Sequence, residues 1–246
     1  MMEETPSQPV ELINRMREEV VSRPYNGPEW CTKFSFEELD GLRDQLADLN
    51  EEIRLAKLKA QDLEQRIFVM EDLKNALLSA QGEALTSAVT RVLERLGWTV
   101  KPALGSPDEL WLVENEKTQA IVRLNYSTQT PNRAELAALA ESVITYWGAH
   151  EIEPKGILVA STHADKPPMD RPDEDFPDSM GEFAKRKNLC LLTTAQLLSV
   201  FRDLDVAETD PKEIRDNILT TSGRVTDYEF NKKGSAAPST TAARKA

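Results

Sequence analysis

The chain has 246 residues with 42 acidic and 30 basic side chains (Lys and Arg), so its formal net charge is −12 and its isoelectric point is near 4.8. This balance argues against tight, sequence-independent binding to phosphate backbones, which relies on an excess of Lys and Arg. The two cysteines, Cys31 and Cys190, are too few for a disulfide scaffold and favour a reducing compartment. No apolar run approaches the ~20 residues of a membrane span, and the acidic start lacks the apolar stretch of a secretion signal. We therefore expect a cytoplasmic protein with no membrane partner.

Two segments precede the first predicted domain. Residues 1–35 contain four prolines and few periodic apolar positions, which predicts a flexible N-terminal arm. Residues 36–80 are predicted to form a coiled-coil helix, because apolar residues alternate there at spacings of three and four. The pattern comprises Leu39, Leu42, Leu46, Leu49, Ile53, Ala56, Ala60, Leu63, Ile67 and Met70, and Leu77 resumes it after Lys74 interrupts it.

A single helix cannot bury so narrow an apolar stripe by itself. The sequence therefore predicts a homodimer formed through residues 39–77. The small side chains of Ala56 and Ala60 make the stripe weaker than an all-Leu one. The alternative to a dimer is a long helix that lies across its own globular domain. The pattern leaves open whether two paired helices would run parallel or antiparallel.

Residues 81–224 are predicted to form an α/β domain with a mixed sheet flanked by helices. A helix between Gly82 and Gly97 comes first, and a long loop at 165–178, rich in proline and acids, is expected to be a solvated lid carrying Lys166 and Arg171. Residues 225–246 lack an apolar face and are predicted to be a disordered tail. The other predicted elements are strands at 98–100, 109–113, 120–124, 156–160 and 189–192, and helices at 133–147, 180–187, 194–201 and 211–221.

One set of residues suggests a chemistry. The chain has no phosphate-binding glycine loop, no zinc-ligand spacing and no nucleophile elbow. It does have Pro107-Asp108 before one predicted strand and, fifteen residues later, Arg123-Leu124-Asn125 at the end of the next. Together with the patterns at 84–100, 154–159 and 188–198, these residues make 77–205 resemble the restriction-endonuclease-like (PD-(D/E)xK, Mrr-like) superfamily.

The resemblance implies a nuclease site in which an Asp and a Glu hold Mg²⁺ and a Lys assists. Asp108 would be the first metal ligand, but Arg123 stands at the second acidic position and Asn125 at the Lys position. A cation at a ligand position repels Mg²⁺, and Asn125 lacks the charge of Lys. Glu83 matches an auxiliary acid that some members carry. The motif is therefore degenerate.

Each of these residues also has a purely structural interpretation. Asp108 would serve only as a turn former, and Glu83 only as an acid favoured by the dipole in the first turn of a helix. Arg123 would form an ion pair with Glu135 or Asp108 and stabilise the fold without taking part in catalysis.

Three functions follow from this sequence. The first is a non-catalytic nuclease-fold protein without a cofactor, acting as a dimeric binding or scaffolding module with a DNA, RNA or protein partner. The second is a Mg²⁺-dependent endonuclease whose active-site acids have migrated to Asp108, Glu83 and Glu109 or Glu114, which requires these carboxylates to converge within about 5 Å. The third is a pure protein–protein adaptor. The degenerate motif weighs against an enzyme.

Overall fold

The computed structural model describes residues 27–103, 105–172, 175–205 and 210–228. Most of the predicted flexible arm (1–35) and disordered tail (225–246) lies outside these ranges. The contacts within the chain divide it into two compact units, with the boundary between Glu64 and Gln65.

The long N-terminal helix expected from the heptad pattern is confirmed. A short 3₁₀ turn, η1 (Glu29–Lys33), precedes α2 (Glu37–Ser79), whose 43 residues fall one short of the predicted helix (36–80) at each end. At ~1.5 Å per residue this helix is about 65 Å long. Among its residues only Leu73 and Leu77 are buried. Most large apolar side chains of the stripe are between 44% and 59% exposed. These are Leu42, Leu46, Leu49, Ile53, Leu63, Ile67 and Met70.

The α/β fold expected for the following domain is also confirmed. In the described residues, six strands form one mixed sheet in the order β1-β2-β3-β4-β5-β6. The first three pair antiparallel, and β3 to β6 pair parallel. The strands are β1 (Thr99–Pro102), β2 (Glu109–Glu114), β3 (Lys117–Tyr126), β4 (Lys155–Ser161), β5 (Leu189–Thr193) and β6 (Gly223–Arg224).

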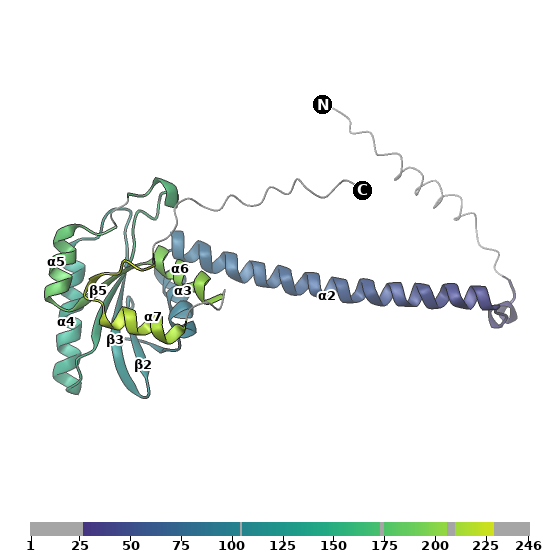
Figure 1. Cartoon of the computed structure of the whole chain (residues 1–246), viewed down its shortest axis with the longest axis horizontal. Helices are drawn as coiled ribbons and strands as arrows, with labels where there is room; N and C mark the ends of the chain where they lie inside the picture. The colour runs from purple at the N-terminus through teal and green to yellow at the C-terminus, as the bar shows by residue number, and fades with distance from the viewer. Residues whose placement is uncertain (1–26, 104, 173–174, 206–209, 229–246) are drawn as a thin grey trace, which may run out of the picture. The chain divides into compact units, whose positions relative to one another are not determined.

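Helices cover both faces of the sheet. Helices α4 (Arg133–His150) and α5 (Asp178–Arg186) pack on one face, where Leu136 and Met180 meet Ile121 and Leu158. The other face is covered by α3 (Gly82–Arg95), α6 (Thr194–Asp205) and α7 (Pro211–Thr220), as Figure 1 shows. Leu73 and Leu77 of α2 belong to this second core. Strands β4 and β5 are buried along their whole length, as expected of parallel strands that helices cover on both faces.

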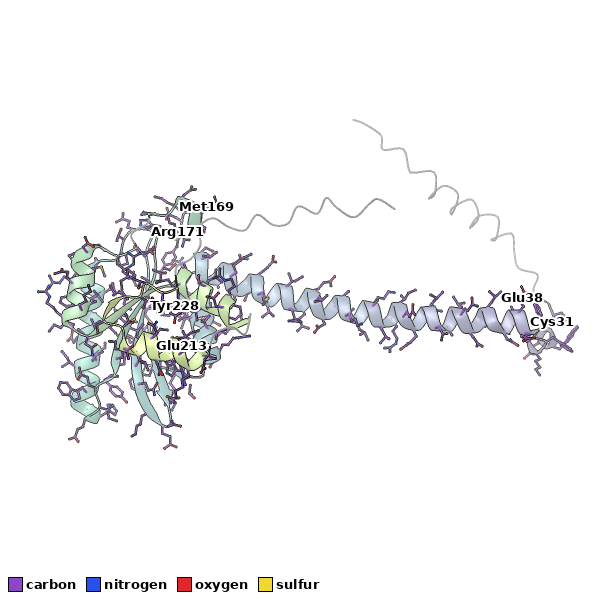
Figure 2. The ribbon with its side chains drawn as sticks, viewed as in Figure 1. Cys31, Glu38, Met169, Arg171, Glu213 and Tyr228 are labelled. Carbon is purple, nitrogen blue, oxygen red and sulfur yellow. The ribbon has the colours of Figure 1, made fainter. Side chains whose placement is uncertain are left out.

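The proline-rich loop differs from its prediction at Arg171. It contains a 3₁₀ turn, η2 (Pro168–Asp170), and although Lys166 is exposed, Arg171 (labelled in Figure 2) is buried rather than presented to solvent. The Arg171 guanidinium donates a hydrogen bond of 2.7 Å from Nη2 to the carbonyl oxygen of Leu78, and one of 3.0 Å from Nε to the carbonyl oxygen of Lys166. The last carbonyls of a helix have no partner within the helix, so a cation is well placed there. No helix of the described chain is long and apolar enough to cross a membrane.

Candidate functional site

The hairpin of β2 and β3 places the motif residues. Its turn, Asn115–Glu116, has positive φ at both residues (50° and 64°), the backbone that two-residue hairpins with a type I′ turn require. Beyond the turn the strand pairing shifts by one residue between Leu112 and Val113, and this shift sets Glu109 directly opposite Arg123 and Trp111 opposite Ile121. Opposed residues point to the same side of a sheet, so these four side chains face the layer of helix α4.

Helix α4 brings two more polar groups over this part of the sheet. Its start is fixed by Asn132, whose side-chain oxygen accepts a hydrogen bond of 2.8 Å from the backbone N–H of Ala134. Glu135 then lies in the first turn, and Ser142 lies seven residues later on the same face. By fixing where α4 begins, the cap also determines which part of the hairpin Glu135 and Ser142 contact.

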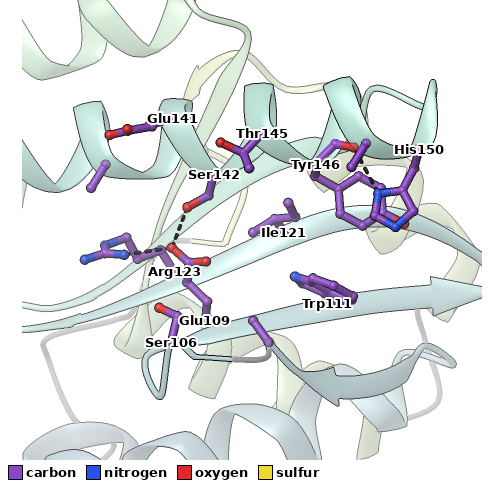
Figure 3. Close-up of a pocket in the computed structure, with 13 residues that line it drawn as sticks. Ser106, Glu109, Trp111, Ile121, Arg123, Glu141, Ser142, Thr145, Tyr146 and His150 are labelled. Atoms are coloured by element: carbon purple, nitrogen blue, oxygen red, sulfur yellow. Dashed lines mark hydrogen bonds and ion pairs between the residues drawn. The ribbon is translucent and has the colours of Figure 1, made fainter.

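Arg123 lies between two carboxylates. Its Nη1 donates to Glu109 Oε1 at 2.7 Å, and its Nε donates to Glu135 Oε2 at 3.1 Å. Ser142 donates a second bond of 2.7 Å to the same oxygen of Glu109, as the dashed lines in Figure 3 show. Glu109 is only 6% exposed, so its charge depends on these partners. One guanidinium and two carboxylates leave the cluster with a formal charge of −1.

The protonation of Arg123 is secured by its surroundings. Partial burial by itself lowers the pKa of the guanidinium. The hydrogen bonds and charges of Glu135 and Glu109 together outweigh that effect, so the pKa of Arg123 is raised above its ordinary value. Arg123 is therefore a permanent cation at the position where the nuclease motif has an acid.

An open groove of about 470 Å³ runs over these residues, between the hairpin and α4. At one end it holds Glu109 and Arg123, and at the other it is lined by aromatic rings (Figure 3). The Tyr146 ring stacks on His150 at 4.0 Å between centroids and meets Trp111 edge-on at 5.2 Å. The Tyr146 hydroxyl donates to Thr118 Oγ1 at 2.8 Å. The groove thus offers a charged end and an aromatic end to a binding partner.

Asn125 lies two residues beyond Arg123 on β3, and the two share a side of the sheet. The oxygen of its side-chain amide is buried and has no hydrogen-bond partner in the described residues. Buried polar atoms in folded proteins are almost always satisfied, by protein or by ordered water. Asn125 is thus the one motif residue with an unused hydrogen-bonding atom turned inward.

The structure places the other predicted site residues elsewhere. Asp108 is exposed in the turn before β2, where its backbone carbonyl accepts from the N–H of Leu124 at 2.8 Å. Glu83 is exposed in the first turn of α3. Glu114 forms an ion pair of 2.8 Å with Arg215 of α7. In the described part of the chain, no three acidic, His or Cys side chains are close enough to hold a metal ion together.

Arg123 pairs with Glu135, one of the two partners that its sequence suggested, while Glu109 takes the place expected for Asp108. Ser142, Tyr146 and His150 were not predicted as site residues. The available signal was weak: Ser142 is a polar residue on the face of α4 that also carries Leu139 and Val143. Comparison with known proteins adds nothing to the geometry, since no protein-family model matches the chain and no curated protein matches it.

Proposed function

We propose that this chain is a non-catalytic protein of the restriction-endonuclease-like fold, which acts as a dimeric binding or scaffolding module in a nucleic-acid-related complex. The order of elements supports this assignment. A helix, three antiparallel strands, a helix, a parallel strand, a helix and a further parallel strand follow one another from α3 to β5. Of the motif residues, Arg123 and Asn125 lie on β3, and Asp108 lies in the turn before β2.

The observation that carries the proposal is the position of Arg123. Its guanidinium occupies the space between Glu109 and Glu135, and it stands at the motif position where a nuclease of this fold has its second metal-binding acid. The cation already balances half of the carboxylate charge, so a divalent ion would have to displace a permanently charged side chain. A fixed guanidinium preserves the folded site without supplying an activated water.

Cleavage assays test the absence of catalysis. Single- and double-stranded DNA and RNA would be incubated with the full chain in Mg²⁺ or Mn²⁺, and we expect no cutting. Cutting by the wild-type chain that disappears in Asp108→Ala would overturn the proposal and support the endonuclease with migrated acids.

A metal-binding test examines the role of Arg123 directly. The variant Arg123→Glu would leave Glu109 and Glu135 next to a third carboxylate, a donor set that suits a divalent cation. Its melting temperature should rise on addition of Mn²⁺, because a ligand that binds only the folded state stabilises it. The uncharged Arg123→Gln is the matched control, and both it and the wild type should show no such rise. A rise in the wild type would contradict the proposal.

The nucleic-acid part of the proposal is separable from the scaffold part. Binding of fluorescent DNA and RNA would be measured at low salt, where electrostatic attraction is strongest. We expect binding that weakens as salt is added. No binding at any salt concentration would leave the pure protein–protein adaptor as the better description.

A further inference from the structure

We propose that α2 pairs with α2 of a second copy of this chain as a parallel, in-register, two-stranded coiled coil over Leu39–Met70. This inference rests on the dimer in the proposed function and adds its orientation and register. It is carried by the exposure of one helix face and by the order of charges beside it.

The seam, defined as the a and d positions from Leu39 to Met70, has the composition of a two-stranded core. Its d positions hold mostly Leu, while Ile53 and Ile67 stand at a positions, the arrangement that favours dimers. The large seam side chains from Leu42 to Met70 are about half exposed, although they are apolar. A second helix with the same pattern would cover them.

Charges beside the seam match only when the two helices run in the same direction. In a parallel, in-register pair, each g residue meets the e residue five positions later on the other helix, and these pairs set orientation. No like-charged pair arises, and one pair, Gln45 with Asn50, is uncharged. The four remaining pairs all join opposite charges: Glu38 with Arg43, Glu52 with Lys57, Lys59 with Glu64 and Arg66 with Glu71.

These charged side chains are available to a partner. Arg43 forms an ion pair with Asp40 of its own helix, at 3.3 Å and on an exposed surface. Within the described ranges the other seven charged e and g side chains make no ion pair inside the chain. The ion pairs that α2 does form are Arg43 with Asp40, Arg54 with Glu51, and Asp72 with Arg91. Apart from Arg43, the charged e and g residues therefore carry complementary charges that form no ion pair within the single chain.

An antiparallel pair satisfies fewer of these charges. With full overlap, Leu39 of one helix lies opposite Met70 of the other, and g then meets g while e meets e. Glu52 finds Lys59 and Arg43 finds Glu64, but four charged side chains find no opposite partner. These four are Glu38, Lys57, Arg66 and Glu71.

The seam ends at Met70 because the next d residue is used elsewhere. Leu77 is completely buried in the core on the α3 side of the sheet, together with Leu73. Neither can contact a second copy without leaving that core. The range expected from the heptad pattern, 39–77, is therefore shortened at its C-terminal end.

A charge-reversal series tests the orientation. Glu52→Lys should weaken dimerisation about tenfold, since it turns two attractive pairs per dimer into repulsive ones. Adding Lys57→Glu should restore wild-type affinity if the helices are parallel, because residue 57 then faces residue 52 of the other copy. Residues 52 and 57 are too far apart on one helix to pair with each other. Dimerisation would be followed by sedimentation equilibrium on the full chain.

The competing pair in this series is Glu52→Lys with Lys59→Glu, which restores affinity only in an antiparallel dimer. That result would overturn the orientation and leave the dimer of the proposed function standing. A wild-type chain that stays monomeric would overturn both, and a trimer would overturn the two-stranded pairing.

Disulfide trapping gives a second, independent measurement. In a Cys31→Ser background, Leu42→Cys should form a disulfide between copies on mild oxidation, because equivalent d positions face each other in a parallel, in-register pair. Glu51→Cys, on the outer face of the same helix, is the matched control and should not cross-link. Cross-linking only when Leu42→Cys is combined with Ile67→Cys would show antiparallel helices and overturn the inference.

Discussion

Arg123 combines a structural and an electrostatic role within one side chain. It neutralises Glu109, which is nearly inaccessible to water, and it ties the hairpin to α4 through Glu135. A buried carboxylate that loses its partner is strongly destabilising, because the charge stays desolvated while the compensating attraction disappears. The stability of this face of the sheet therefore depends on Arg123.

Arg123→Met measures that dependence, since it keeps most of the apolar stem and removes the charge. We expect the free energy of unfolding in urea at neutral pH to fall by about 2–3 kcal/mol, slightly less than for a fully buried pair, because Arg123 retains some exposure. Glu135→Gln leaves Glu109 paired and should cost less than about 1 kcal/mol. Equal losses in the two variants would contradict the dominant role of Glu109.

Cys190 on β5 gives a prediction for alkaline pH. Burial raises the pKa of this thiol to about 12, in spite of the opposing charge of Lys155. In the unfolded chain a thiol loses its proton near pH ~8.5, so between that pH and about 12 only the folded state holds the proton. Stability should therefore decline by about 1.4 kcal/mol per pH unit as pH rises above ~8.5.

Urea unfolding at pH 8, 9 and 10 would measure this decline. Cys190→Ala should be less stable at pH 8 but should show a shallower decline, since it has no thiol to ionise. Cys31→Ser changes an exposed cysteine and should keep the wild-type slope. The same slope in all three chains would show that Cys190 is not responsible.

The sequence predicted part of the candidate site. The degenerate motif identified Arg123 and Asn125, and Glu135 was one of two expected partners of Arg123. Spacing could not show that Glu109, rather than Asp108, faces Arg123, because that depends on the one-residue register shift between Leu112 and Val113. Without this shift, the pairing of Glu114 with Lys117 at the turn would continue along the strands and set Asp108 opposite Arg123. The contribution of Ser142 depends on how α4 crosses the sheet, which no local pattern encodes.

At the scale of elements, the crossing of α4 over β4 depends on Gly156. A Cβ atom at this position would overlap Leu189 Cδ2 and lie 3.1 Å from Val143 Cγ2, and both neighbours are buried. Gly156→Ala should therefore destabilise the fold by about 1–3 kcal/mol through overpacking. Gly148→Ala, in α4 with open space around it, should be neutral or stabilising by up to about 1 kcal/mol. Thermal unfolding of both variants measures the difference.

Most elements could be predicted from the spacing of apolar residues and from the glycine, proline and capping residues at their ends, with errors at the element boundaries. The hairpin, the two buried strands β4 and β5, and α4 all lie where their patterns placed them. The two-residue strand β6 gave no signal, because it is defined by pairing with β5 rather than by its own composition. The sequence likewise carried no signal for the burial of Arg171 in the proline-rich loop. That burial depends on a contact with Leu78 of α2, which lies 93 residues earlier in the sequence.

At the scale of the whole molecule, the proposed dimer predicts a mass and a concentration dependence. The mass in solution should be about twice 27.6 kDa, and the melting temperature should rise with protein concentration, because association stabilises the folded chain. Leu49→Pro interrupts the middle of the seam and should give a monomer whose melting temperature no longer depends on concentration. A monomeric wild type would refute the dimer.

The bond from Arg171 to the end of α2 also affects how the protein opens. The Arg171 guanidinium donates hydrogen bonds to the carbonyl oxygens of both Leu78 and Lys166, so the same side chain links the loop around residues 166–171 to the last turn of α2. Segments that share their stabilising contacts open as one cooperative unit in native-state hydrogen exchange. The amides of this loop and of the last turn of α2 should therefore exchange at matching rates in the wild-type chain and at different rates in Arg171→Met.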